Sequence, residues 1–404
     1  MPGNLRDRLK RIQRLEKEKT AVRGTNNTGG SDISFFAEQS WVPAGYLTLR
    51  YEVTSGEDMA LPAVMPEAAG IVMPGITGAT AYEDLLFFDL ETSGLSGGAG
   101  TLAFLAAFGR LIPAGGAGSK TARYKIHITQ YLLLDYPGES NFVERLLGEF
   151  NGNSTIVSYN GKSFDSQILK TRCLMNGMIP PEYRHADLLH PARRLWKNIL
   201  PDCSQGTIET AVLGIDRTGD IPGAMAPEIW FSFLRNGTAD GNANALLKIA
   251  EHNRRDITGL AAILRAMTRI AADPLAAMKT INFDLESLAL RWHALNNKTG
   301  HRLLQYTAEN GHPRAGLSYA FALLKAGNFD EGREWLLKTA SAGQPPSQIA
   351  ALRALAIDSE HRLKNAAEAL SFTEKGLKLL ASDSPRREEF ERRLQRLKCR
   401  LNSE

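Results

Sequence analysis

The sequence predicts an α/β fold, in which a mixed β-sheet is covered by helices, followed by an all-helical region. Between residues 83 and 272, three strand-like runs come first, and helices then alternate with short strands. Beyond about residue 283 the apolar residues recur only at helical spacing. We therefore expect the 404 residues to form three parts, which are residues 1–82, 83–275 and 283–404.

The first part is expected to contain a basic helix, a linker and an irregular segment. Residues 6–23 hold eight Lys or Arg against three acids, and the Gly- and Asn-rich stretch RGTNNTGGSD follows. Residues 34–82 are broken repeatedly by Pro and Gly, and only GYLTLRYEV alternates like a strand. This part therefore does not predict a core of its own.

The second part predicts the sheet, one element after another. The runs DLLFFDL, TLAFLAAFGRL and YKIHITQYLLL are separated by Gly-rich connections that suit hairpins. A helix (ESNFVERLLGEF), a strand (TIVSY), a second helix (SFDSQILKTRCLMNG) and a further strand (YRHADLL) follow. The part ends in helices, the last of which contains HNRRD.

The third part contains two segments that each read as a helix, a short turn and a second helix. They are offset by about 37 residues when Asn328 is aligned with Asn365. This pattern resembles tetratricopeptide repeats, and an unrelated bundle of helical hairpins is the alternative.

Two acids lie at the end of the first strand of the second part. Because side chains alternate along a strand, Asp89 and Glu91 point to the same side. Two close carboxylates repel each other unless a cation lies between them, and Mg²⁺ or Mn²⁺ suits oxygen ligands. The alternative is an exposed strand end with two solvated acids.

Two further groups of polar residues lie on helices. Asp165 is in the first turn of its helix, where the helix dipole alone would also favour an acid. His252 and Asp256 are four residues apart and share one helix face, which also suits a surface ion pair.

The order of these motifs resembles the DEDD superfamily of 3′–5′ exonucleases, which has the ribonuclease H-like fold. The resemblance rests on FDLETSGL, YNGKSFDSQIL and HNRRD, and it covers about residues 83 to 272. The segments HADLLHPARRLWK, GTIETAVLGIDRTGDIPG and APEIWFSFLRNG make the chain most similar to the YprB-like branch, which tends to carry a helical repeat region after this domain.

The resemblance implies a centre with two ions of Mg²⁺ or Mn²⁺ that hydrolyses phosphodiester bonds. Its four metal ligands would be Asp89, Glu91, Asp165 and Asp256. Asp187 also follows the family pattern, and we expect it to have a structural role. Lys162 and Asn160 are candidates for contact with substrate, and the alternative is that they are ordinary polar residues of the loop.

The chain departs from the DEDD pattern at the residue that orients the water for attack on the phosphodiester bond. In the larger groups of DEDD exonucleases, this residue is a His five positions before the last Asp or a Tyr four positions before it. Here His252 occupies the four-position slot and Glu251 the five-position slot. His252 is therefore a candidate general base.

We expect a metal-dependent nuclease, specifically a 3′–5′ exonuclease acting on DNA or RNA. The alternative is a weakly active or inactive nucleic-acid-binding module whose helical region recruits a protein. The net charge of +4 is compatible with a polyanionic partner. The charged first twenty residues, the lack of any apolar run near 20 residues and three scattered cysteines predict a cytoplasmic protein without a membrane segment.

Overall fold

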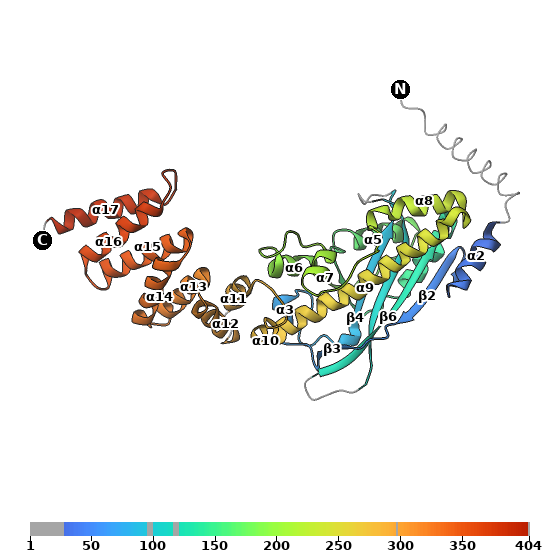
Figure 1. Cartoon of the computed structure of the whole chain (residues 1–404), viewed down its shortest axis with the longest axis horizontal. Coiled ribbons are helices and arrows are strands. Elements are labelled where there is room, and N and C mark those ends of the chain that lie inside the picture. Colours follow the sequence, from blue (N-terminus) through green and yellow to red (C-terminus); the bar gives the residue numbers. More distant parts are fainter. Residues whose placement is uncertain (1–27, 95–99, 116–120, 296–297, 403–404) are drawn as a thin grey trace, which may run out of the picture. The chain divides into compact units, whose positions relative to one another are not determined.

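A computed structural model describes residues 28–94, 100–115, 121–295 and 298–402 (Figure 1). The chain divides into two compact units, and the division does not fall at a single point of the sequence. The first unit consists of Met1–Leu189 and Ser204–Thr268. The second unit consists of His190–Cys203 and Arg269–Glu404. The basic helix expected within residues 6–23 lies outside the described residues.

The first unit is built on one mixed sheet, which confirms the predicted α/β class. The described residues form its eight strands: β1 (Val42–Gly45), β2 (Thr48–Thr54), β3 (Met59–Pro62), β4 (Leu85–Thr92), β5 (Ala103–Pro113), β6 (Thr121–Leu133), β7 (Thr155–Ser158) and β8 (Arg184–Asp187). The order is β1-β2-β6-β5-β4-β7-β8, and β3 also pairs with β6. β7 runs parallel to β4 and β8, and the other pairs are antiparallel. The segment of residues 34–82 therefore supplies the strand expected from GYLTLRYEV, β2, and two strands that were not expected, β1 and β3.

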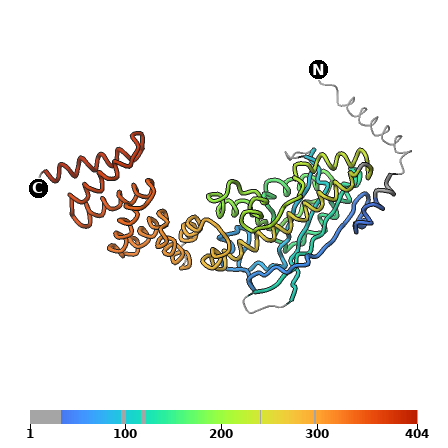
Figure 2. The backbone as a smooth tube through the Cα atoms, viewed as in Figure 1, coloured from blue at the N-terminus to red at the C-terminus, as the bar shows by residue number. Residues whose placement is uncertain are grey.

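Helices cover the sheet and separate its parallel strands. They are α2 (Thr28–Glu38), α3 (Ala69–Val72), α4 (Glu139–Leu147), α5 (Asp165–Met175), α7 (Gln205–Ala211), α8 (Ala226–Asn236) and α9 (Asn242–Ala272), whereas α6 (Leu189–Trp196) lies almost entirely in the second unit. The long helix α9 runs along the sheet, as the traces in Figures 1 and 2 show.

Both faces of the central strand β4 are covered, which explains its continuous apolar run. On one face Phe88 stacks on Phe108 of β5, with ring centroids 5.1 Å apart. On the other face α9 comes very close to β5 at Gly109, where an added Cβ would lie 2.5 Å from Cγ2 of Ile257. This glycine lets α9 approach the sheet closely enough for its polar side chains to reach the end of β4.

The described part of the second unit contains helices and no strand, as the spacing predicts. Its helices after α9 are α10 (Pro274–Ala277), α11 (Leu285–Ala294), α12 (Lys298–Glu309), α13 (Pro313–Lys325), α14 (Phe329–Ala342), α15 (Pro345–His361), α16 (Ala366–Leu379) and α17 (Arg387–Leu401). From α11 onward each helix packs on the next. Asn328 and Asn365, the residues aligned in the sequence, immediately precede α14 and α16.

The earlier segment of the second unit is fixed by hydrogen bonds to the later one. The indole Nε1 of Trp196, a fully buried side chain, donates to the carbonyl of Asn282 over 2.8 Å. The side-chain amide of Asn198 donates to Oδ2 of Asp284 over 2.6 Å. These contacts explain why the segment groups with the helices that follow α9.

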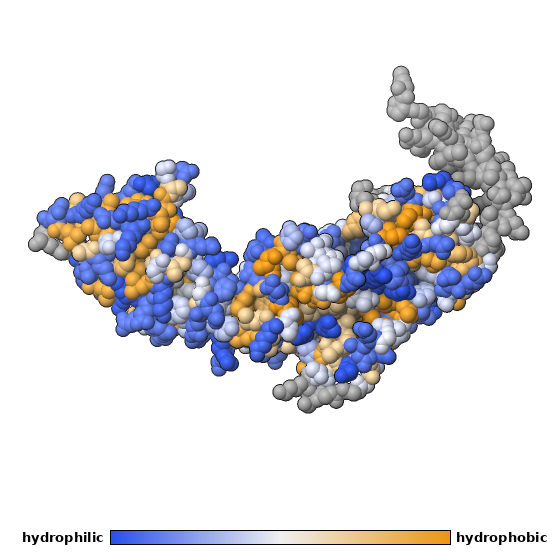
Figure 3. All heavy atoms as spheres, in the orientation of Figure 1, coloured by the Kyte–Doolittle hydropathy of each residue, from blue (hydrophilic) through white to orange (hydrophobic). Residues whose placement is uncertain are grey.

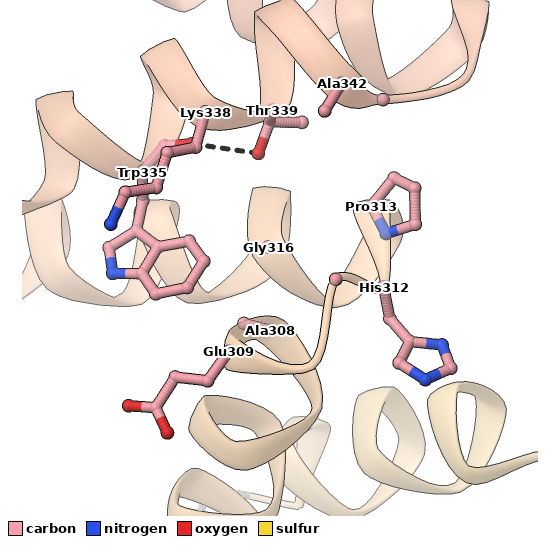
Figure 4. Close-up of a pocket in the computed structure, with 11 residues that line it drawn as sticks. Ala308, Glu309, His312, Pro313, Gly316, Trp335, Lys338, Thr339 and Ala342 are labelled. Carbon is pink, nitrogen blue, oxygen red and sulfur yellow. Dashed lines mark hydrogen bonds between the residues drawn. The ribbon is translucent and has the colours of Figure 1, made fainter.

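A pocket of about 490 Å³ lies among α12, α13 and α14 (Figure 4). Trp335 and Pro313 lie on opposite sides of it, and the ammonium of Lys338 is 4.5 Å from the Trp335 ring centroid. Glu309 also contributes to the lining, which thus combines charged, aromatic and small residues and does not select one class of ligand.

Hydrophobic and hydrophilic residues are interspersed on the face of the molecule that Figure 3 shows.

Candidate metal centre

The two acids of β4 lie where the central strand ends. Asp89 pairs with Ala107 of β5, which in turn pairs with Gln130 of β6. Cross-strand partners share a face, so Asp89, Gln130 and the next odd-numbered residue, Glu91, lie on the face that α9 covers. The expected common orientation of Asp89 and Glu91 follows directly from this pairing.

Asp187 fixes the loop that follows β7. Its carboxylate accepts hydrogen bonds from the backbone amides of Asn160 (2.9 Å), Lys162 (3.0 Å) and Leu189 (3.0 Å). Asn160 has a φ of 65°, a left-handed conformation that asparagine tolerates better than most residues. Asp187 therefore acts on the loop backbone, in keeping with the structural role expected for it.

The same loop delivers Asp165 to the end of β4, because β7 and β4 are parallel and end at the same edge. Gly161 makes the approach possible, since an added Cβ would lie 2.9 Å from Oδ2 of Asp165 and 2.5 Å from Oγ of Ser158. Asp165 is only 5% exposed and takes part in a backbone hydrogen bond at Leu90. It is thus a buried side chain directed at β4, rather than an exposed acid that only caps α5.

A buried asparagine on α9 holds Asp89. Nδ2 of Asn253, a fully buried residue, donates to Oδ2 of Asp89 over 2.7 Å. Its Oδ1 accepts from Nε2 of Gln130 over 3.0 Å, and the same nitrogen donates to the carbonyl of Ala250 over 2.8 Å. Sequence reasoning missed Asn253, because only the fold brings its partner Gln130 close to it.

Asp256 and His252 face each other on α9. Arg217, in the loop after α7, contacts Asp256 and two further acids. His252 Nε2 lies 3.3 Å from Oδ2 of Asp256, and His252 Nδ1 lies 3.0 Å from Oδ1 of Asp220. The guanidinium of Arg217 contacts Oδ1 of Asp256, Oδ2 of Asp220 (2.8 Å) and Oε2 of the fully buried Glu209 (2.6 Å). Arg217, Asp220 and Glu209 were not among the predicted site residues.

Burial and mutual repulsion act on three of the acids. Burial, followed by the negative charges of Asp165, Asp256 and Glu91, raises the pKa of Asp89 well above its usual range. Burial, and then the charges of Asp256 and Asp165, likewise raises the pKa of Glu91. Burial is also the largest cause that raises the pKa of Asp165 to about 7. The four predicted ligands are therefore close enough to interact electrostatically.

The donor set suits a divalent cation. One ligand atom each from Glu91, His252 and Asp256 lies within 4.8 Å of the others. Among the described residues, no Lys or Arg forms an ion pair with Asp89, Glu91 or Asp165. Buried carboxylates without a protein cation are stabilised by a bound metal, and oxygen ligands favour Mg²⁺ and Mn²⁺. The residues present thus fit a divalent ion.

Comparison with known proteins shows what this chain is similar to. Residues 86–268 match the family model of the RNase_H superfamily. The chain is also 31% identical, over 332 residues, to the protein YprB of Bacillus subtilis (strain 168), which covers 79% of this chain and 76% of YprB. The chain belongs to the YprB family. The ribonuclease H-like fold and the YprB-like resemblance expected from the motifs are both confirmed.

A solved structure gives a more distant match to this YprB-family chain. It is the family B DNA polymerase from the hyperthermophilic archaeon Pyrobaculum calidifontis, with 16% identity and a TM-score of 0.31. The match covers 52% of this chain and 28% of the polymerase chain.

Two arginines that lie between His252 and Asp256 on α9 have local partners. Arg254 contacts Glu251 and the hydroxyl of Tyr51, and Nε of Arg255 lies 3.1 Å from Oε1 of Glu251. The side chain of Lys162 is exposed in the loop before α5. In the described part of this YprB-family chain, no helix is both long enough and apolar enough to cross a membrane.

The raised pKa values predict how the stability of the metal-free protein depends on pH. A carboxyl group with a raised pKa binds a proton in the folded state at a pH where the unfolded chain has lost it. For Asp165 this window runs from 3.8 to about 7, so stability falls as the pH rises through it. The upper limit is several kcal/mol, since one pKa unit corresponds to about 1.36 kcal/mol.

Thermal unfolding in EDTA at pH 5 and pH 8 measures this effect. We expect a lower melting temperature at pH 8, recovery on addition of Mn²⁺, and a weaker pH dependence in Asp165→Asn. A metal-free melting temperature that is equal or higher at pH 8 contradicts the electrostatic account.

Proposed function

We propose that this YprB-family chain is a metal-dependent nuclease that hydrolyses phosphodiester bonds, and that it acts as a 3′–5′ exonuclease. The supporting observation is the convergence of acids from β4, α5 and α9 within a domain of the RNase_H superfamily. These acids repel one another at a buried site, where no described Lys or Arg pairs with Asp89, Glu91 or Asp165. A site of this kind is costly unless it binds cations.

In this proposal the ligands of two Mg²⁺ or Mn²⁺ ions are Asp89, Glu91, Asp165 and Asp256. The ions, when bound, supply an activated water and stabilise the leaving oxygen. Asn253 orients Asp89 through its amide, and Asp187 fixes the loop that presents Asp165. The ammonium of Lys162 on that loop would contact a substrate phosphate, and Asn160 would shape the loop for that contact.

The test uses the full chain with single- and double-stranded DNA and RNA carrying a 5′ label. We expect stepwise shortening from the 3′ end with Mg²⁺ or Mn²⁺ and none with EDTA. Loss of cleavage in Asp89→Asn, which removes a proposed ligand, would exclude a contaminating nuclease. Binding without cleavage of any substrate by folded, metal-loaded protein would instead support the nucleic-acid-binding module.

A further inference from the structure

We propose that His252 is a direct metal ligand through Nε2, held in place by Asp220, and that its ion site prefers Mn²⁺ to Mg²⁺. This inference rests on the metal centre of the proposed function. It changes the role of His252, because a ring nitrogen whose lone pair binds a metal cannot accept a proton from water.

The first observation is the pairing of His252 with one particular oxygen of Asp256. Arg217 contacts Oδ1 of Asp256, so Oδ2 is the oxygen left for a metal. Nε2 of His252 lies 3.3 Å from this Oδ2. Neighbouring ligands of an octahedral ion with bonds of about 2.1 Å lie about 3 Å apart, so both atoms suit one ion.

The second observation is that the carboxylate of Glu91 lies close to His252 and Asp256. Glu91 is 9% exposed, and no described side chain hydrogen-bonds or ion-pairs with it. Its carboxylate comes within 4.8 Å of the donor atoms of His252 and Asp256. Glu91 is thus a nearly buried, unpaired acid beside an imidazole nitrogen and a free carboxylate oxygen. These three donors form one side of an ion site.

The third observation is the carboxylate on the opposite side of the imidazole. Oδ1 of Asp220 lies 3.0 Å from Nδ1 of His252, and Oδ2 of Asp220 lies 2.8 Å from Nη1 of Arg217. Nδ1 is buried and forms no hydrogen bond, so Asp220 acts on it through the negative charge of its carboxylate at this short distance. Asp220 favours the proton on Nδ1, which leaves the Nε2 lone pair free for a metal.

The fourth observation is that a glycine, Gly223, lies beside Nε2. An added Cβ at Gly223 would lie 3.2 Å from this nitrogen, so a glycine at this position keeps the approach clear. A cavity of about 480 Å³ is lined by His252, Asp256, Arg217 and Asp220 together with α7. The cavity therefore reaches two of the three donors, His252 and Asp256.

The chemistry of the donors sets the metal preference. Mg²⁺ is bound almost entirely by oxygen ligands, whereas Mn²⁺, which also suits carboxylates, is a transition ion and accepts an imidazole nitrogen more readily than Mg²⁺ does. A site that combines Glu91, Asp256 and His252 therefore binds Mn²⁺ more tightly than Mg²⁺. Sites formed only by carboxylates would show a smaller difference.

Pulsed electron paramagnetic resonance of the Mn²⁺-loaded full chain tests the ligand directly. We expect the wild-type protein to show coupling between Mn²⁺ and a directly bound ¹⁴N nucleus. His252→Gln should lose the coupling, whereas His127→Gln, which changes a histidine on β6 near Glu52, should retain it. Asp220→Asn keeps the imidazole and should weaken Mn²⁺ binding by about 10–100-fold in calorimetric titration.

Mn²⁺ that binds the wild-type protein without nitrogen coupling would overturn the role of His252 and leave the carboxylate centre intact. Coupling that persists in His252→Gln would also overturn it. Failure of folded wild-type protein to bind Mn²⁺ at all would overturn both this inference and the proposed function. If His252→Gln does not fold, two measurements still test the role of His252. They are the nitrogen coupling in the wild-type spectrum and the Mn²⁺ affinity of Asp220→Asn.

Discussion

Asp89→Asn is expected to reduce metal-dependent cleavage by about 10³-fold or more, because metal ligation supplies several kcal/mol of transition-state stabilisation. The fold should survive, since the amide oxygen can still accept the hydrogen bond from Asn253. In EDTA at pH 8 the variant should be more stable than the wild type, because it lacks a buried charge that repels Asp165, Asp256 and Glu91.

Cleavage rates and melting temperatures, with and without Mn²⁺, measure both effects. Asp58→Asn, which changes an exposed acid, is the matched control and should behave like the wild type. Wild-type activity together with an unchanged Mn²⁺-induced shift in Asp89→Asn would remove Asp89 from the centre.

Arg217→Met is expected to destabilise the first unit by about 3–5 kcal/mol in EDTA, the usual cost of leaving a buried ion pair without one partner. The guanidinium contacts Glu209, Asp220 and Asp256, and its own side chain is only 15% exposed. Glu209 cannot turn away to solvent, because it packs against Gly259 of α9, where an added Cβ would lie 1.7 Å from Oε1.

Urea unfolding together with native-state hydrogen exchange of α7 and α9 measures this loss. The control is Arg255→Met on α9, whose pair with Glu251 is about two-fifths exposed and should contribute less than about 1 kcal/mol. Equal effects of the two substitutions would show that the three-acid cluster around Arg217 does not support the fold.

Much of the sheet was predictable because its strands have strong local signals. The apolar runs of β4, β5 and β6 and the short strands β7 and β8 all appear at the expected positions. The four-residue strands β1 and β3 were not predicted. They interrupt a Pro- and Gly-rich stretch, and they are stabilised by pairing with β2 and β6 rather than by their own pattern.

The predicted acids do come together, because parallel strands end at one edge and α9 crosses the same face. The residues that surround them were not predictable in the same way. Asn253 depends on Gln130, a partner 123 positions away, and Arg217 lies in a loop without periodicity. Their roles come from tertiary contacts that no local spacing encodes. The assignment of residues 190–203 to the second unit has the same origin.

The central claim is that the acids of β4, α5 and α9 bind divalent metal. Its most direct test is X-ray diffraction at the manganese absorption edge, from crystals of the full chain soaked in Mn²⁺. We predict anomalous density within bonding distance of the Asp89 and Glu91 carboxylates, with further density contacts to Asp165 and Asp256. Anomalous density confined to other acids of the protein, with none beside Asp89, would contradict the account.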